Sequence, residues 1–211
     1  MGTIATLRGR SDGSKTGVLG GGAAAPSNVG YMTVPREWIL LTYKLTPDPS
    51  SRARVAVWRE VRRSGALHLQ QSVVAFPDVE AFRPALDRFR TLVGELGGES
   101  LAVRGGPVEG GDGDRLVASW NAARDGEFAE LVAECGKFLS EIDHEFEIEK
   151  FTSAELEEEE AELDKLERWH ERIRARDVCG CPGAAEADAA LGRAREALER
   201  YSQAVFDRTV P

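Results

Sequence analysis

The chain has 211 residues, 42% of them hydrophobic, and a formal net charge of −9 at pH 7. This length suits one large or two small domains, and the apolar fraction is sufficient for a core without disulfides or metals. No run approaches the roughly eighteen apolar residues of a membrane span, and the first residues lack the apolar segment of a signal peptide. We therefore expect a cytoplasmic protein that does not enter a membrane.

The first 35 residues differ in composition from the rest of the chain. Residues 1–35 are rich in Gly, Ser and Ala without hydrophobic periodicity, which predicts disorder. Met32 lies shortly before the first predicted strand and is a candidate for the true first residue of the protein. Residues 9–16, GRSDGSKT, superficially resemble a phosphate-binding loop. We reject that interpretation because no strand precedes them, no helix follows, and Ser14 stands where the motif has the glycine next to its lysine.

A strand followed closely by an amphipathic helix opens the structured part of the chain. Residues 38–45 are rich in aromatic and branched side chains, which predicts a strand, and two prolines that cannot donate ladder hydrogen bonds follow it. Residues 52–63 place their apolar side chains on one side of a 3.6-residue wheel, which predicts a helix. Ser50 or Ser51 can cap its start, and Gly65 can end it. The apolar side of this helix is predicted to consist of Val57, Trp58 and Val61.

A hairpin, a second helix and a short last strand follow. Residues 66–77 alternate apolar and polar side chains around a candidate turn at Gln71 and Ser72, which predicts a hairpin or one long bent strand. Residues 79–96 predict a helix, and Pro84 is compatible with it if the regular helix begins there. Residues 100–103 predict the last strand. The order βαββαβ predicts a ferredoxin-like domain with two helices covering one sheet face.

Charge separates this domain from the rest of the chain. Residues 36–108, the predicted ferredoxin-like domain, contain 11 Lys/Arg and 8 Asp/Glu, whereas residues 109–211 contain 13 and 27. The acidic half shows three long amphipathic patterns joined by short links, which predicts an antiparallel three-helix bundle. The apolar pattern of its first helix begins with Leu116, Trp120 and Ala123. The predicted core residues that follow are Phe128, Leu131, Cys135, Phe138 and Ile142 in the first helix, Leu156, Leu163, Leu166, Trp169 and Ile173 in the second, and Ala187, Leu191, Ala194, Leu198, Tyr201 and Val205 in the third. The predicted fold class is therefore α+β, and the two halves are expected to face different partners or each other.

The first helix carries the strongest candidate for a binding surface. At 100° per residue Arg52, Arg59 and Arg63 fall within about 40° of one another, with Arg62 beside them. Such a basic ridge would neutralise DNA phosphates and give an affinity that falls steeply with salt. The alternatives are a solvated helix face, or a dock for the acidic bundle of the same chain or of a second copy.

The candidates for other chemistry are weaker. Cys179 and Cys181 would suit a soft metal or an oxidant sensor, with His170 about two helical turns earlier, but a closed zinc site usually needs four ligands and no second pair is evident. We favour the interpretation that Cys179 and Cys181 lie in a helix-connecting loop by chance and have no chemical role. Cys135 is expected to be a small hydrophobic side chain in the core. The other two histidines, His68 and His144, are expected on the surface and show no arrangement that would suggest a triad. We predict no catalytic residue, metal ligand or cofactor, and therefore no enzyme.

Several segments resemble a known family. The first strand is followed by R-x-x-V-W-R-x-V-x-R-x-G and then by L-Q-x-S-V. This pattern resembles the middle domain of PaaX-type repressors and, more distantly, the small nuclease subunit of CRISPR spacer acquisition. It is most similar to the N-terminal domain of ChrB, the chromate-resistance regulator. Further segments that resemble ChrB N-terminal sequences are NAARD at 121–125, KFT at 150–152, LDKLERW at 163–169 and RARDV at 174–178.

The resemblance has consequences for function. It implies a DNA-binding transcriptional regulator linked to chromate resistance, and a homodimer formed by edge-to-edge pairing of ferredoxin-like sheets. In the CRISPR subunit the first strand ends with an aspartate that holds a catalytic metal. Tyr43 and Lys44 stand there in this chain, and an ammonium repels a cation, so metal-dependent cleavage is not expected.

The resemblance also leaves an alternative function open. The similar sequence extends from about Trp38 to Phe206. Full-length ChrB proteins carry a further C-terminal domain, and we expect this chain, which stops at Pro211, to lack it. The alternative is a non-DNA-binding assembly subunit whose acidic bundle binds a separately encoded protein of the ChrB C-terminal type. No typical helix-turn-helix or winged-helix reader is evident, which weakens the regulator hypothesis.

Overall fold

The structure is a computed structural model that describes residues 37–47, 49–105, 108 and 110–209. All of these residues belong to one compact unit, Met32–Pro211. The predictions made for residues 1–35, including the candidate start at Met32 and the rejected phosphate loop, lie outside the described residues.

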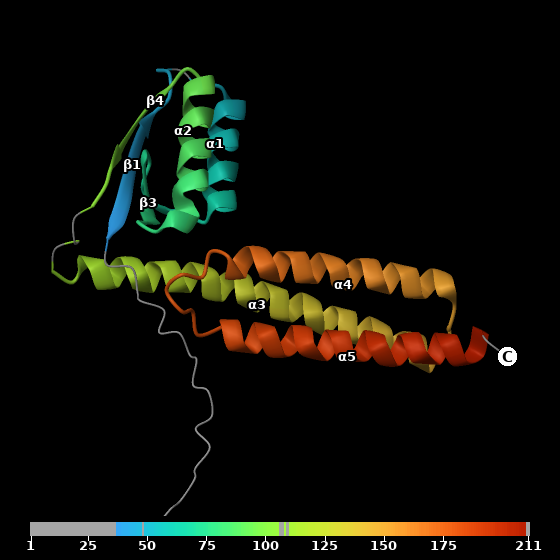
Figure 1. Cartoon of the computed structure of the whole chain (residues 1–211). Helices are drawn as coiled ribbons and strands as arrows, with labels where there is room; N and C mark the ends of the chain where they lie inside the picture. Colours follow the sequence, from blue (N-terminus) through green and yellow to red (C-terminus); the bar gives the residue numbers. More distant parts are fainter. Residues whose placement is uncertain (1–36, 48, 106–107, 109, 210–211) are drawn as a thin grey trace, which may run out of the picture. The chain divides into compact units, whose positions relative to one another are not determined.

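A four-stranded antiparallel sheet with the order β2-β3-β1-β4 carries two helices on one face (Figure 1). The strands are β1 (Trp38–Lys44), β2 (Leu67–Gln70), β3 (Val73–Pro77) and β4 (Glu99–Val103), and the helices are α1 (Ser51–Ser64) and α2 (Arg83–Glu95). This strand order, with a helix after β1 and another after β3, is the ferredoxin-like arrangement. The predicted α+β fold is confirmed, and residues 66–77 form the hairpin rather than one bent strand.

The ends of α1 and α2 follow from residues that satisfy or tolerate free backbone groups. Ser50 accepts a hydrogen bond from Ala53 N at 3.1 Å, and Gly65 ends α1 with a φ of 72°, which glycine adopts without a Cβ clash. A 3₁₀ helix, Glu80–Phe82, leads into α2. Pro84 lies in the first turn of α2, where its missing N–H removes no intrahelical bond, as predicted.

The core of this part lies between the sheet and its two helices. Ile39 and Leu41 on β1 and Phe89 on α2 are fully buried there. Trp58 was predicted to face this core, and that prediction is wrong, because 59% of Trp58 is exposed. On the helical wheel Trp58 lies about 100° from Val57, at the edge of the apolar stripe, so its ring projects beside the core.

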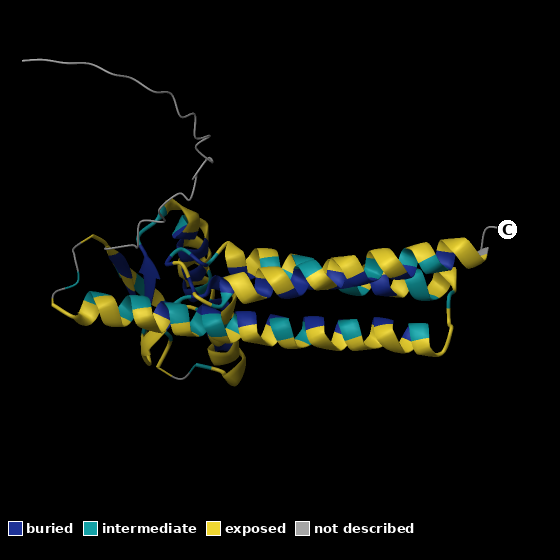
Figure 2. Cartoon of the chain, turned by 90° about the horizontal axis from the view of Figure 1, so that it is seen from below, coloured by how far each residue is buried: buried dark blue, intermediate teal, exposed yellow. Residues whose placement is uncertain are grey.

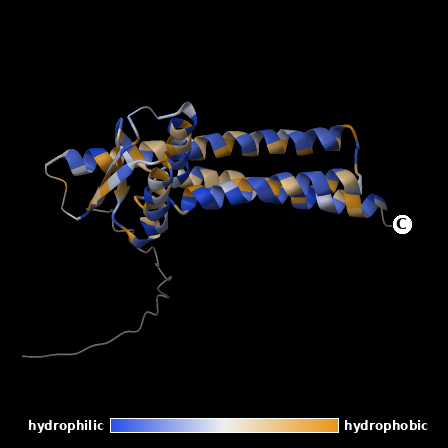
Figure 3. Cartoon of the chain, turned by 90° about the horizontal axis from the view of Figure 1, so that it is seen from above, coloured by the Kyte–Doolittle hydropathy of each residue, from blue (hydrophilic) through white to orange (hydrophobic). Residues whose placement is uncertain are grey.

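Three long helices enclose the second core. They are α3 (Asp112–Glu147), α4 (Ser153–Arg174) and α5 (Ala184–Thr209). The predicted core positions from Phe128 onward are buried or pack against this core, which confirms the helical periodicity. Leu116 and Trp120, earlier on α3, pack against the core of the sheet and its helices instead. Figure 2 shows the buried positions along the faces that the helices turn toward one another. Figure 3 shows that much of the surface of these helices is hydrophilic. No helix among the described residues is long and apolar enough to cross a membrane.

Two glutamates lie buried between the bundle helices. Glu145 of α3 is 7% exposed and Glu159 of α4 is 4% exposed, and one carboxylate oxygen of each has no hydrogen-bond partner among the described residues. Burial is the main cause that raises the pKa of Glu159 to about 7. Repulsion by neighbouring carboxylates adds to the effect of burial, and these neighbours are Glu141, Glu145, Glu158 and Glu155.

We expect Glu159→Gln to stabilise the protein at pH 8 by about 1–2 kcal/mol and to have little effect at pH 5. Because the pKa is raised on folding, the favourable contribution of Glu159 is complete below its unfolded pKa and is lost as the pH rises through about 7. Urea unfolding at both pH values measures this, with the exposed Glu157→Gln on the same helix as control. An equal change at both pH values would contradict the raised pKa.

Candidate nucleic-acid interface

The predicted arginine ridge lies on the solvent side of α1. Arg52, Arg59, Arg62 and Arg63 are all exposed. The side chains of Arg52 and Arg59 form no hydrogen bond or ion pair with any described residue, so both charges are available to a partner. Arg63 Nη2 lies 2.6 Å from Glu60 Oε2, yet 63% of the Arg63 side chain remains exposed.

Arg62 belongs to a different side of the helix. It lies about 80° from Arg52 on the wheel, and the centre of its guanidinium lies 5.5 Å from the Trp58 ring centroid, within cation–π range. The ridge therefore consists of Arg52, Arg59 and Arg63. The structure brings these three together, while Arg62 pairs with the exposed tryptophan.

Arg88 on α2 adjoins the ridge and was not predicted from the sequence. Arg88 Nε lies 3.7 Å from Glu60 Oε1, so Arg63 and Arg88 share the same carboxylate. Glu60 is only 6% exposed, and the two guanidinium groups compensate its buried charge. The basic surface therefore extends from α1 onto α2. Nothing in the sequence indicates how the two helices are aligned, so Arg88 could not be assigned to this surface beforehand.

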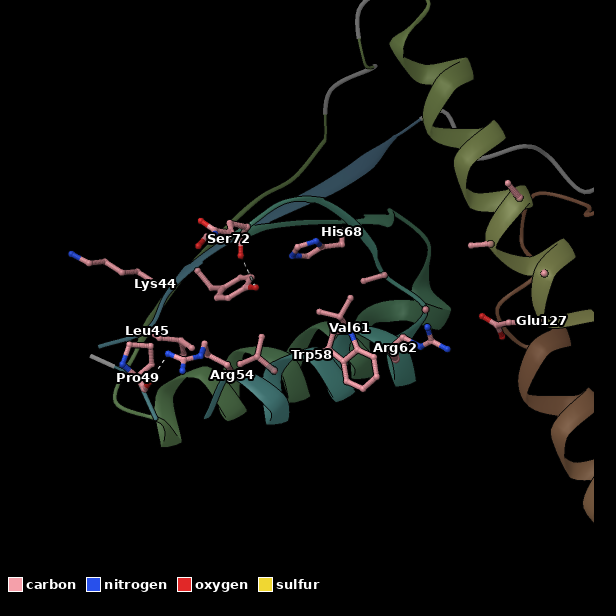
Figure 4. Close-up of a pocket in the computed structure, with 18 of the residues that line it drawn as sticks. Lys44, Leu45, Pro49, Arg54, Trp58, Val61, Arg62, His68, Ser72 and Glu127 are labelled. Atoms are coloured by element: carbon pink, nitrogen blue, oxygen red, sulfur yellow. Dashed lines mark hydrogen bonds between the residues drawn. The ribbon is translucent and has the colours of Figure 1, made fainter. Parts of the chain in front are cut away.

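A cleft of about 890 Å³ opens beside α1, on the side that carries Arg62 (Figure 4). In Figure 4 Trp58 and Arg62 lie on α1, and His68 lies across from them on the β2–β3 hairpin. Residues near the end of β1 line one end of the cleft, and residues of α3, including Glu127, line its other end. The volume is within the range of sites for small organic ligands.

The sequence profile of the family described as "Protein ChrB, N-terminal" matches residues 54–210, from α1 to the end of α5. The chain belongs to the ChrB N-terminal family. No curated protein matches it significantly. The predicted resemblance to ChrB is thereby confirmed, and the resemblance to the PaaX middle domain stays a prediction.

Two arginines from the segments that resemble ChrB hold the C-terminal end of α1. Arg124, 3% exposed, donates from Nη1 to Gly65 O at 3.2 Å and from Nη2 to Glu127 Oε1 at 2.8 Å. Arg176 donates from Nη1 to Arg62 O at 3.3 Å and pairs with Glu127. Burial lowers the pKa of Arg176, although Glu127 acts in the opposite direction. The last carbonyls of a helix lack intrahelical donors and carry partial negative charge, so both guanidinium groups stabilise this end.

The acidic residues of the same segments position the loop that contains two cysteines. Asp125 accepts hydrogen bonds from Gly183 N at 2.8 Å and from the thiol of Cys181, and Asp177 accepts one from Cys181 N at 2.8 Å. Mainly through burial, the pKa of Cys179 is raised to about 11 and that of Cys181 to about 12. Both thiols are 6% exposed or less and protonated at neutral pH, which favours a structural role over an oxidant sensor.

The other candidates for metal chemistry are also engaged in packing. His170 Nε2 lies 2.6 Å from Asp188 Oδ1 and so links α4 to α5, without approaching a cysteine ligand set. Cys135 is fully buried in the bundle core, as predicted. No group of three or more His, Cys, Asp or Glu side chains suited to a metal is found among the described residues.

We expect Cys179 and Cys181 to react with a thiol reagent at pH 8 at least about a hundredfold more slowly in the native protein than in denaturant. Their raised pKa values suppress the reactive thiolate, and burial restricts access. Mass spectrometry after timed alkylation distinguishes these cysteines from Cys135. Rapid native modification of either one, with the helical circular dichroism unchanged, would refute the structural assignment.

Proposed function

We propose that this member of the ChrB N-terminal family is a DNA-binding regulatory protein whose α1 ridge contacts DNA phosphates. Family membership suggests a regulator related to chromate resistance. The observation that carries the proposal is the ridge itself: Arg52, Arg59 and Arg63 share one exposed helix face, and the first two have no partner among the described residues. Guanidinium groups match phosphate oxygens in geometry as well as charge.

The charge distribution supports one orientation of DNA on the protein. Arg52 and Arg63 are separated by about 16 Å along the helix axis, and B-DNA carries one charge per roughly 1.7 Å of its axis. The ridge therefore meets several phosphates in one encounter. The acidic residues of 109–211 outnumber the basic ones, so that half repels DNA and favours approach from the α1 side.

We also propose a homodimer and a non-catalytic role. Strands β2 and β4 are the sheet edges among the described residues, and unpaired edges are suited to pairing with a second sheet. At the end of β1 the Tyr43 hydroxyl donates to Gln71 O at 3.0 Å, and Lys44 is exposed. Lys44 lies close to the position where the CRISPR nuclease subunit has its metal-binding aspartate, and its positive charge disfavours metal-dependent hydrolysis there.

One observation favours the second candidate, an assembly subunit that binds a ChrB-type C-terminal protein. The sheet face opposite α1 and α2 exposes Leu101 by 64%, Val103 by 55% and Leu40 by 36%. Neighbouring apolar side chains that stay exposed are typical of protein interfaces. This candidate would need no contact between α1 and DNA, so the two functions separate experimentally.

The test is a comparison of the full chain on two duplexes of equal length, one from the DNA upstream of its own gene and one of unrelated sequence. The regulator function predicts at least about tenfold tighter binding to the upstream duplex at the same salt concentration. Equal affinity for the two duplexes would contradict a sequence-specific regulator. Absence of binding to both would leave the assembly subunit as the supported function.

A further inference from the structure

A second pattern on α1 lies beside the ridge and has no role in the function proposed above. Arg54, Trp58 and Arg62 follow one another at intervals of four residues and therefore share one stripe of the helix. All three are exposed, and Trp58 is 59% exposed, although tryptophan is highly buried on average. The stripe forms the α1 wall of the cleft in Figure 4.

The cleft combines a flat aromatic surface with positive charge. Trp58 presents its ring, with the Arg62 guanidinium 5.5 Å from the ring centroid, and Tyr43 and His68 line the other wall. The cationic lining residues are Lys44, Arg54, Arg62 and Arg124, and the acidic ones are Glu127 and Glu130. Glu127 is already bonded to Arg124 and Arg176, so it offers little repulsion to an anionic ligand.

Two polar groups of the cleft are available to a ligand. His68 and Lys44 form no side-chain hydrogen bond or ion pair with any residue that the structure describes. Arg54 donates to Pro49 O at 2.7 Å through Nη1, which fixes the position of its guanidinium at the edge of the cleft. An anionic ligand with a planar ring therefore finds a stacking surface, a positioned cation and free hydrogen-bonding groups.

We propose that this cleft binds an unpaired nucleotide of a DNA strand, with its base stacked on Trp58 and its flanking phosphates held by Arg54 and Arg62. Aromatic side chains stack with any base, and arginines beside them neutralise the backbone. The proposal extends the proposed DNA-binding function to a second side of α1 and rests on it. It does not use any arginine of the ridge.

The spacing of the stripe favours a nucleotide within a strand over a free nucleotide. Arg54 and Arg62 each lie one helical turn from Trp58, on opposite sides of it, about 6 Å along the axis. A nucleotide inside a strand has a phosphate on each side of its base, whereas a mononucleotide carries a phosphate on one side only. The symmetric pair of cations therefore matches the strand.

The experiment uses the tryptophan indole N–H signals in a two-dimensional ¹⁵N NMR spectrum. The chain has four tryptophans, so the spectrum contains four such signals, and loss of one in Trp58→Phe assigns Trp58. A short oligothymidylate is expected to shift the Trp58 signal, while the signals of the buried Trp38 and Trp120 stay in place. Thymidine monophosphate is expected to bind at least about tenfold more weakly.

Matched variants separate this proposal from the ridge. Arg54→Gln with Arg62→Gln is expected to weaken oligothymidylate binding at least about tenfold. Arg52→Ala with Arg59→Ala removes the same amount of charge from the ridge and is expected to leave the Trp58 shift intact. The same ridge variant is expected to weaken duplex DNA binding, so the failure of one site is visible independently of the other.

The outcomes decide the proposal. A Trp58 shift that saturates with oligothymidylate and is lost in the Arg54/Arg62 variant supports it. An absent shift, or equal affinity for thymidine monophosphate and the oligonucleotide, overturns it. Retained oligonucleotide binding by a folded Trp58→Ala variant also overturns it, because stacking on this ring is the central contact.

Discussion

Trp120→Ala is expected to lower the free energy of unfolding by about 3–5 kcal/mol, the largest stability change among the variants considered. Trp120 of α3 is fully buried, and its ring packs edge-to-face against Trp38 at 5.9 Å and Phe82 at 5.2 Å between centroids. Its Nε1 donates to Arg176 O at 3.0 Å. Removal of the indole leaves a cavity and an unpaired carbonyl where α3 meets the sheet.

The matched control is Trp58→Ala, which removes the same side chain from an exposed position. Because 59% of Trp58 is exposed, we expect a loss of no more than about 1 kcal/mol. Urea unfolding followed by circular dichroism measures both variants. Equal destabilisation by the two substitutions would contradict the role of Trp120 as the residue that joins α3 to the sheet.

The triple variant Arg52→Ala, Arg59→Ala, Arg63→Ala is expected to weaken duplex DNA binding by about tenfold to a hundredfold at low salt. Each arginine that contacts a phosphate releases condensed counterions on binding. The slope of log K against log salt should therefore become shallower by about 2.7 per protomer. A salt series of fluorescence anisotropy titrations yields both quantities.

The control for total charge is a second triple variant, Arg172→Ala, Arg193→Ala, Arg200→Ala. These arginines are exposed on α4 and α5, and their side chains form no hydrogen bond or ion pair with described residues. The net charge falls by the same amount in both variants, so non-specific electrostatics change alike. If the control weakened binding as much as the ridge variant did, the effect would come from net charge rather than from α1.

Local patterns in the sequence were sufficient for the fold. Ser50 and Gly65 set the ends of α1, Pro84 marked the first turn of α2, and the three- and four-residue spacings identified the bundle core. These features depend on capping, backbone geometry and burial within one element. For that reason a single sequence reveals them.

The candidate sites required knowledge of how elements pack. The wheel assigned Trp58 to the core because it does not show where the sheet ends beside α1. The pairing of Arg62 with the Trp58 ring also depends on side-chain positions that the wheel does not give. Arg88 joins the ridge only through a carboxylate shared between two helices. Likewise, Arg124 resembled a family motif in the sequence, whereas its contact with Gly65 O depends on the packing of α3 against α1.

The central claim is that α1 binds DNA through phosphate contacts, and a salt titration of the unmodified chain on its own upstream duplex tests it most directly. The account predicts binding at low salt that weakens log-linearly as salt rises, with a slope near −2.7 per protomer from the three ridge arginines. Absence of binding at low salt, or an affinity that does not change with salt, would contradict the claim.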